Sequence, residues 1–195
     1  MRFHNSNKWN NLMFQTPAGK RHNLNEHHSS NITVIAGNWI EAVGTIISAI
    51  GSTPSTIFSE QTLTDFNLIG NILEAGGIAI AAKTEDSLLN NVGDELQAIG
   101  NIVVVASILT NNEQLSQQLE TQGDLLQVVG TGITINTQGK LTLLETIANT
   151  GNIIQLIGNV IQVFANTDTQ EGIIMNAVGA WTQAVGAVTT ALASD

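Results

Sequence analysis

The octapeptide Gly37-Asn38-Trp39-Ile40-Glu41-Ala42-Val43-Gly44 decides the fold, because it recurs five more times along the chain. The other copies begin at Gly70, Gly93, Gly123, Gly151 and Gly179. Each copy has glycine at both ends, Asn or Asp at the second position in all but the last copy, and Glu or Gln at the fifth. Regular recurrence over a few tens of residues is typical of architectures in which each repeat packs against its neighbours.

The spacing of the two glycines favours helices over strands. Residues seven apart lie two turns apart on nearly the same side of an α-helix, whereas in a strand they face opposite sides. Helix-start signals precede several copies, for example Ser59-Glu60 and Asn111-Asn112-Glu113. We therefore predict an all-α domain of about six antiparallel helices built from a degenerate repeat of about 28 residues. The helices are expected at roughly residues 34–50, 61–82, 86–109, 113–131, 141–165 and 170–193.

One segment fits two interpretations. From Gly132 to Leu143 the sequence alternates with a period of two, which is typical of a small β-hairpin. The β-branched run Val103–Val105 and the cost of glycine in a helix, about 1 kcal/mol relative to Ala, also weigh against helices. The segment 132–143 is therefore either helical or a hairpin.

The octad has one narrow polar stripe. With its first glycine at heptad position a, the Asn/Asp residues fall at b and the Glu/Gln residues at e, which are three apart on the same helix face. The remaining positions are mostly apolar. We expect the polar stripe to be the hydrated side, and the rest of the helix to be covered on two sides.

The octad glycines are the candidate packing residues. Small residues at fixed positions let two helix backbones approach closely. We assign helix packing and self-association to all twelve: Gly37, Gly44, Gly70, Gly77, Gly93, Gly100, Gly123, Gly130, Gly151, Gly158, Gly179 and Gly186. The sequence leaves open whether these contacts form within one chain or also between subunits.

Charge divides the chain into two parts. Residues 1–31 are a basic tail rich in His and Asn, expected to be disordered alone, and residues 32–195 are the acidic helical repeat domain. The net charge is −10 and charged residues make up only 11%. An acidic body argues against nucleic acid as a partner, so we predict none. We predict that the tail docks on a neighbouring subunit through Arg2, Lys8, Lys20 and Arg21.

The residues needed for common catalytic and metal sites are absent from the repeat domain. The chain has no Cys, and no His follows His28. Position e changes from Glu to Gln after the second copy, and Gln replaces Glu as a surface hydrogen-bonding residue but not as a ligand or base. We therefore predict no enzymatic activity, no cofactor and no metal.

The repeated Gly-Asn-x-x-Glu/Gln-Ala-Val-Gly resembles an uncharacterised family of repetitive helical proteins of bacilli, over about residues 35–193. No established activity comes with this resemblance. Because bacilli build proteinaceous fibres and layers around spores, the resemblance implies a structural role.

Low charge and helices that are apolar almost all round favour a self-assembling structural protein, a subunit of a homopolymeric filament or layer. The alternative is a membrane-active helical protein, either a pore former or a lipid-surface binder. The N-terminus shows no secretory signal, and no apolar run reaches the length of a spanning helix. We therefore expect synthesis in the cytoplasm, with release to or deposition on a spore or cell surface.

Overall fold

The computed structural model describes residues 17–83, 87–137 and 139–194, with side chains described from residue 31 onward. The described residues form six helices and no strand. These are α1 (Pro17–Gly51), α2 (Glu60–Ala82), α3 (Leu88–Leu109), α4 (Glu113–Thr134), α5 (Leu143–Val163) and α6 (Gln170–Leu192). The all-α prediction is confirmed. In the segment 132–143, α4 continues to Thr134, and the described residues 135–137 and 139–142 form neither a helix nor a hairpin.

Polar caps fix the starts of α2 to α6. The side chains of Ser59, Ser87, Asn112, Thr142 and Thr169 each accept a hydrogen bond from a backbone N–H in the first turn of the helix that follows. At α5 this is a reciprocal capping box, in which Glu145 accepts a hydrogen bond from the backbone N–H of Thr142. That interaction holds the pKa of the exposed Glu145 carboxyl below its ordinary value.

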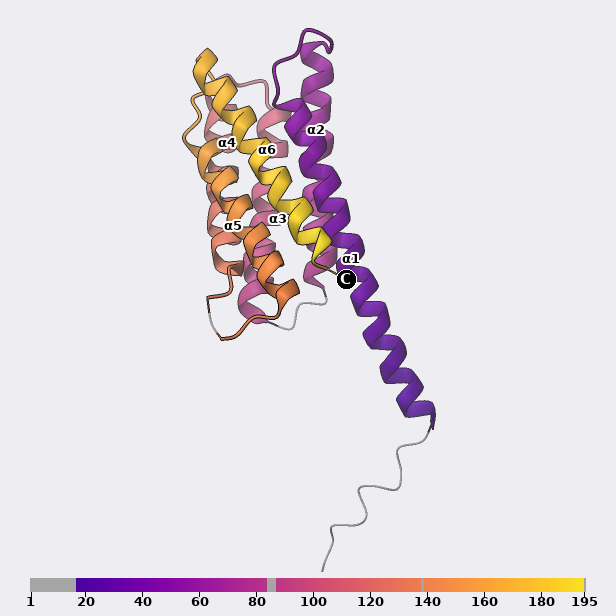
Figure 1. Cartoon of the computed structure of the whole chain (residues 1–195). Coiled ribbons are helices and arrows are strands. Elements are labelled where there is room, and N and C mark those ends of the chain that lie inside the picture. The colour runs from indigo at the N-terminus through magenta and orange to yellow at the C-terminus, as the bar shows by residue number, and fades with distance from the viewer. Residues whose placement is uncertain (1–16, 84–86, 138, 195) are drawn as a thin grey trace, which may run out of the picture.

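The six helices close into a ring. Consecutive helices are antiparallel and pair as three hairpins, α1–α2, α3–α4 and α5–α6 (Figure 1). Each hairpin packs on the next, and α6 returns to α1. Within the described residues, the backbone of every helix packs against its two ring neighbours, and helices across the ring meet only through side chains. The ring therefore has an interior and an exterior that each helix faces with different residues.

The octad glycines lie face to face inside each hairpin. A Cβ added to Gly37 would lie 2.7 Å from the carbonyl oxygen of Gly77, and one added to Gly44 would lie 2.8 Å from that of Gly70. Real Cβ atoms do not come this close to backbone, so only glycine permits the contact. The other two hairpins repeat the arrangement with the pairs Gly93 and Gly130, Gly100 and Gly123, Gly151 and Gly186, and Gly158 and Gly179.

The first helix begins well before its predicted start at residue 34. The helix α1 starts at Pro17, and its first turns extend beyond the other five helices (Figure 1). Of the tail-docking candidates, Lys20 and Arg21 belong to these turns, and Arg2 and Lys8 lie outside the described residues. Docking of the tail on a second subunit remains a prediction.

Candidate functional site

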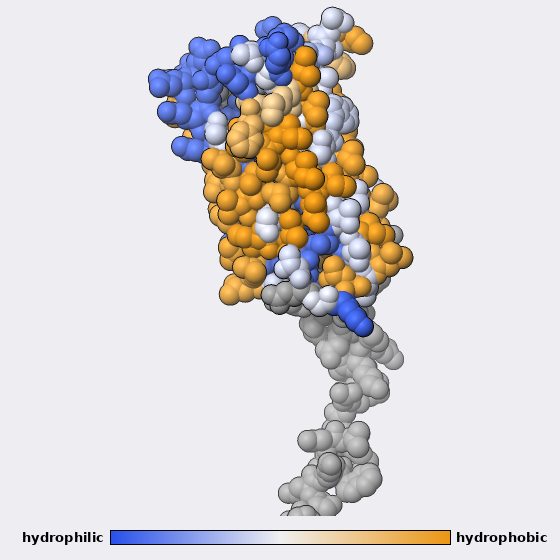
Figure 2. Space-filling model, turned by 60° about the vertical axis from the view of Figure 1, so that its left-hand side comes forward, coloured by the Kyte–Doolittle hydropathy of each residue, from blue (hydrophilic) through white to orange (hydrophobic). Residues whose placement is uncertain are grey.

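The exterior of the ring is apolar. Octad positions c and g point outward and carry exposed Trp, Ile, Leu and Val side chains in all three hairpins. We call the following residues the apolar belt: Trp39, Val43, Ile69, Ile72, Ile99, Ile102, Leu125, Val129, Ile153, Ile157, Val178, Trp181 and Val185. Figure 2 shows hydrophobic residues over most of one face, with hydrophilic residues gathered at one end of it. Glu95 is the one charged residue at an outward octad position.

The interior of the ring is polar. The buried apolar residues are mostly alanines, such as Ala42 and Ala187 where α1 meets α6. The largest side chains that are essentially fully buried are instead Glu74, Asn101, Asn159, Thr45 and Thr131. The predicted hydrated position of the polar stripe is therefore wrong. The stripe faces inward, because each helix turns its Glu/Gln position toward the ring centre and its bulky apolar positions toward the outside.

The Glu and Gln residues at octad position e converge in the ring interior. Gln183 Nε2 on α6 donates to Glu74 Oε2 on α2 and to Gln127 Oε1 on α4, both at 3.1 Å. These three helices are not neighbours in the ring, so their side chains meet across its interior. We call Glu74, Gln127 and Gln183 the central cluster.

Several oxygens in the interior have no donor. Within the described residues Glu74 Oε1, Asn101 Oδ1 and Asn159 Oδ1 are buried without a hydrogen-bond partner. The amide nitrogens of the two asparagines are used: Asn101 donates to the Gln97 carbonyl oxygen at 3.3 Å, and Asn159 donates to Thr131 Oγ1 at 3.2 Å. Buried acceptors are normally satisfied by protein, water or an ion.

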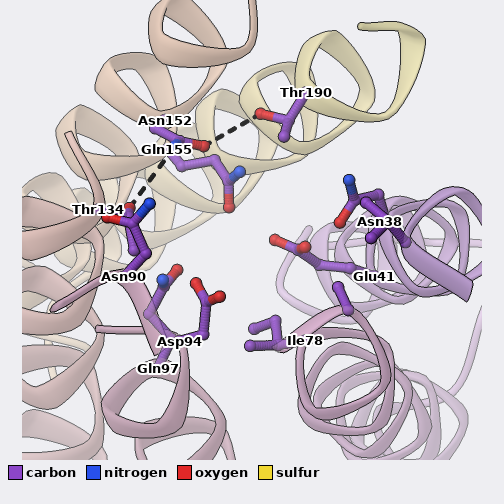
Figure 3. A pocket seen from close by; sticks show the side chains of 12 residues that line it. Asn38, Glu41, Ile78, Asn90, Asp94, Gln97, Thr134, Asn152, Gln155 and Thr190 are labelled. Atoms are coloured by element: carbon purple, nitrogen blue, oxygen red, sulfur yellow. Dashed lines mark hydrogen bonds between the residues drawn. The ribbon is translucent and has the colours of Figure 1, made fainter. Parts of the chain in front are cut away.

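An axial cavity of about 170 Å³ opens at one end of the ring. All six helices contribute to its lining, so it lies on the ring axis. Figure 3 shows the carboxyl groups of Glu41 and Asp94 pointing into this space from α1 and α3, with the amide of Gln155 above them. Asn152 Oδ1 on α5 accepts a hydrogen bond from Thr190 Oγ1 at 3.2 Å at the rim.

A second cavity of about 220 Å³ lies between two neighbouring helices toward the other end of the ring, since it is lined by the N-terminal half of α4, by Gln162 near the end of α5 and by residues 165–168 of the α5–α6 connection. Three carboxyl groups line it, those of Glu120, Asp124 and Asp168. Gln117 Nε2 donates to Asp168 Oδ1 at 2.7 Å and joins α4 to the α5–α6 connection.

The described residues contain no group of three or more His, Cys, Asp or Glu side chains that could hold a metal ion. The carboxyls are instead divided between the two cavities, with Glu41 and Asp94 at one and Glu120, Asp124 and Asp168 at the other. The sequence placed Glu41, Asp94 and Asp124 in the polar stripe but predicted that stripe to be hydrated, and it did not single out Glu120 or Asp168 as site residues. Burial of the stripe could have been inferred in four of the six copies from the alanine at the adjacent position f, because small residues there bring two helices close together on that side.

Although no unbroken apolar run in the sequence reaches spanning length, two helical segments, Asn31–Gly51 and Leu88–Leu109, are long and apolar enough on average to cross a membrane. This is weak evidence on length and composition alone, because core helices of soluble proteins pass the same test. Core helices are mostly buried, however, and here only 39% and 33% of the two segments is buried.

The fold and site define a ring of three repeated glycine-paired hairpins around a polar interior. The chain belongs to a family of unknown function, DUF6944, whose match covers residues 32–191. Comparison with curated proteins and with solved structures gave no match.

Proposed function

We propose that this protein is embedded in a membrane as a six-helix ring, with the apolar belt against lipid and the polar residues enclosed. The observation that carries this proposal is the inverted polarity of the bundle: Glu74 is 2% exposed whereas Trp181 and Val185 are 42% and 56% exposed. A soluble bundle gains most of its stability from burying its large apolar side chains. This ring exposes them on every hairpin and buries alanine, glycine, amides and carboxyls instead.

The dimensions of the helices suit a bilayer. The helices α2 to α6 have 21 to 23 residues. At 1.5 Å per residue they are about 33 Å long, close to the roughly 30 Å of a bilayer's hydrocarbon core. Most exposed charges lie near helix ends, with Glu60, Glu113 and Glu171 at one end of the ring and Lys83 and Lys140 at the other. Such a distribution leaves the middle of the exterior almost free of charge.

The contacts between helices are also those that a membrane favours. Lipid provides no hydrophobic drive for helices to associate, so close packing through small residues takes its place. The glycine pairs inside each hairpin, together with Ala49, Ala180 and Ala184 between α1 and α6, supply such packing. On the exterior, an apolar groove of about 440 Å³ between α2 and α3 and another of about 610 Å³ along α6 have the shape and lining that acyl chains fill.

Two lysine substitutions on α4, one inside the apolar belt and one outside it, test the proposal. Leu125 lies in the belt at mid-helix on α4, and Gln118 lies seven residues earlier, outside the belt and also exposed. We expect Leu125→Lys to prevent flotation of the protein with liposomes, since a lysine at mid-membrane costs about 3 kcal/mol. Gln118→Lys is the matched control and should float like the parent protein. If both variants float equally, or the parent stays in solution without detergent, the membrane location is wrong.

The second candidate is the self-assembling filament or layer, in which copies of the chain cover the belt. The same exposed apolar side chains and the low charge support it. It predicts ordered polymers by negative-stain microscopy in detergent-free buffer, and no flotation with liposomes. Single particles that appear only in detergent would count against it.

A further inference from the structure

We propose that the ring interior is a passage for monovalent cations, closed in this structure by the central cluster. This inference rests on the membrane location proposed above. It assigns a role to the axial cavity, to the second cavity and to the buried side chains between them.

A continuous polar row connects the two cavities along α4. The residues Gln117, Glu120, Asp124, Gln127, Thr131 and Thr134 follow each other at spacings of three and four, so they share one helix face. The first three line the second cavity, and Thr134 lines the axial cavity. Gln127 and Thr131, between them, are buried against the side chains of other helices: Gln127 Oε1 accepts from Gln183, and Thr131 Oγ1 lies 2.9 Å from Gln97 Oε1.

The middle of this route offers oxygens that lack donors. Asn101 and Asn159 lie one turn beyond Gln97 and Gln155, which line the axial cavity, so their side chains continue the same inward faces. The unpartnered Oδ1 atoms of both asparagines and the unpartnered Oε1 of Glu74 belong to residues that are at least 98% buried, with relative exposures of 1%, 2% and 2%. An unpaired buried acceptor costs about 1–3 kcal/mol. A cation, or water molecules accompanying it, would satisfy these oxygens.

The acidic side chains along the route favour cations. Carboxyl groups stand at both ends, Glu41 and Asp94 at the axial cavity and Glu120, Asp124 and Asp168 at the second one. Neither described lining contains a Lys, Arg or His. Rings of acidic side chains favour cations over anions in channels.

The spread of the carboxyls favours monovalent over divalent ions. A calcium site gathers six to eight oxygens, several of them from carboxylates, in one place. No such cluster occurs in the described residues, and the oxygens of the route come mainly from separate amides. Conduction needs sites that bind an ion weakly enough to release it.

The passage is closed where Gln183 bridges Glu74 and Gln127. These two hydrogen bonds join α6 to α2 and α4 across the ring interior. Opening therefore requires the Gln183 side chain to leave the axis.

Planar bilayers containing the purified full-length protein, with a gradient of KCl, test the proposal. We expect a conductance that prefers K⁺ to Cl⁻, because Asp and Glu are the only ionisable residues in the described linings of the two cavities. Asp124→Asn, which keeps the side-chain shape, should lower the K⁺ preference several-fold. Gln183→Ala should raise the conductance by removing the bridge. Glu113→Gln is the matched control, since Glu113 is exposed on the same helix outside the lining of either cavity.

Flotation with liposomes and the helical circular dichroism of each variant are measured alongside. If the protein floats but conducts no ions, or prefers Cl⁻, the cation passage is wrong and the membrane location stands. If Asp124→Asn and Glu113→Gln change the selectivity equally, the assigned route is wrong. If the protein does not insert, both proposals fall together.

Discussion

The interior and the exterior of the ring are formed by the same helices but have opposite polarity. On α5, Asn152 turns inward and binds Thr190, while its neighbour Ile153 is exposed in the belt. This contrast shows that the octad determines which side of each helix faces the ring interior, as well as how closely two helices pack. Its glycines set the distance between two helices, and its fifth residue then faces the ring centre.

The largest expected loss of stability comes from disrupting the close glycine contact between α1 and α2. Gly77 and Gly76 are adjacent on α2, but a Cβ on Gly77 would lie 2.6 Å from the Gly37 carbonyl oxygen, whereas one on Gly76 meets nothing within 4 Å. We expect Gly77→Ala to lower the free energy of unfolding by about 2–3 kcal/mol, because the α1 and α2 backbones must separate.

Gly76→Ala is the internal control for that measurement, made by thermal unfolding in detergent. It should raise stability by up to about 1 kcal/mol, because alanine is the better helix former. Equal losses for the two variants would mean that the glycines do not act through close contact.

A smaller effect is expected on the outside of the ring. Trp39 and Trp181 occupy the same outward octad position in the first and last copies. Trp181 Nε1 donates to Thr53 Oγ1 at 2.9 Å, whereas the Trp39 indole has no hydrogen bond to another described residue. Trp181→Phe should therefore cost about 1 kcal/mol of stability in detergent. Trp39→Phe should cost less, and a larger loss there would mean that Trp39 has a partner of its own.

Much of the fold could be predicted from the sequence, because period and glycine spacing are local signals. The helix ends followed from caps such as Ser59 and Asn112. The direction of the polar stripe could not be predicted in the same way. A stripe of Asn and Glu on an apolar helix has the same periodicity whether it faces water or a ring centre, and only the meeting of Glu74, Gln127 and Gln183 distinguishes the two.

The start of α1 at Pro17 also could not be predicted from local sequence signals. Residues 17–31 are polar, and composition predicts disorder for such a segment. They continue a helix whose apolar part begins near Ile32, and a helix once formed extends at little cost. Glu41 and Asp94 of the axial cavity and Asp124 of the second cavity were visible in the sequence as octad positions b and e, whereas Glu120 and Asp168 lie outside the octads. The convergence of the octad residues depends on the closure of α6 onto α1.

The smallest expected effect on stability is in the interior, at Asn101. This side chain is buried and leaves Oδ1 without a partner, and its amide donates only to the Gln97 carbonyl oxygen at 3.3 Å. Removing an unsatisfied acceptor relieves its desolvation, so Asn101→Leu should leave the free energy of unfolding unchanged or raise it by about 1 kcal/mol. Thermal unfolding in detergent measures this. A clear loss of stability would show that the oxygen is already satisfied by a bound water or cation, so that the interior is a filled site rather than an unpaired one.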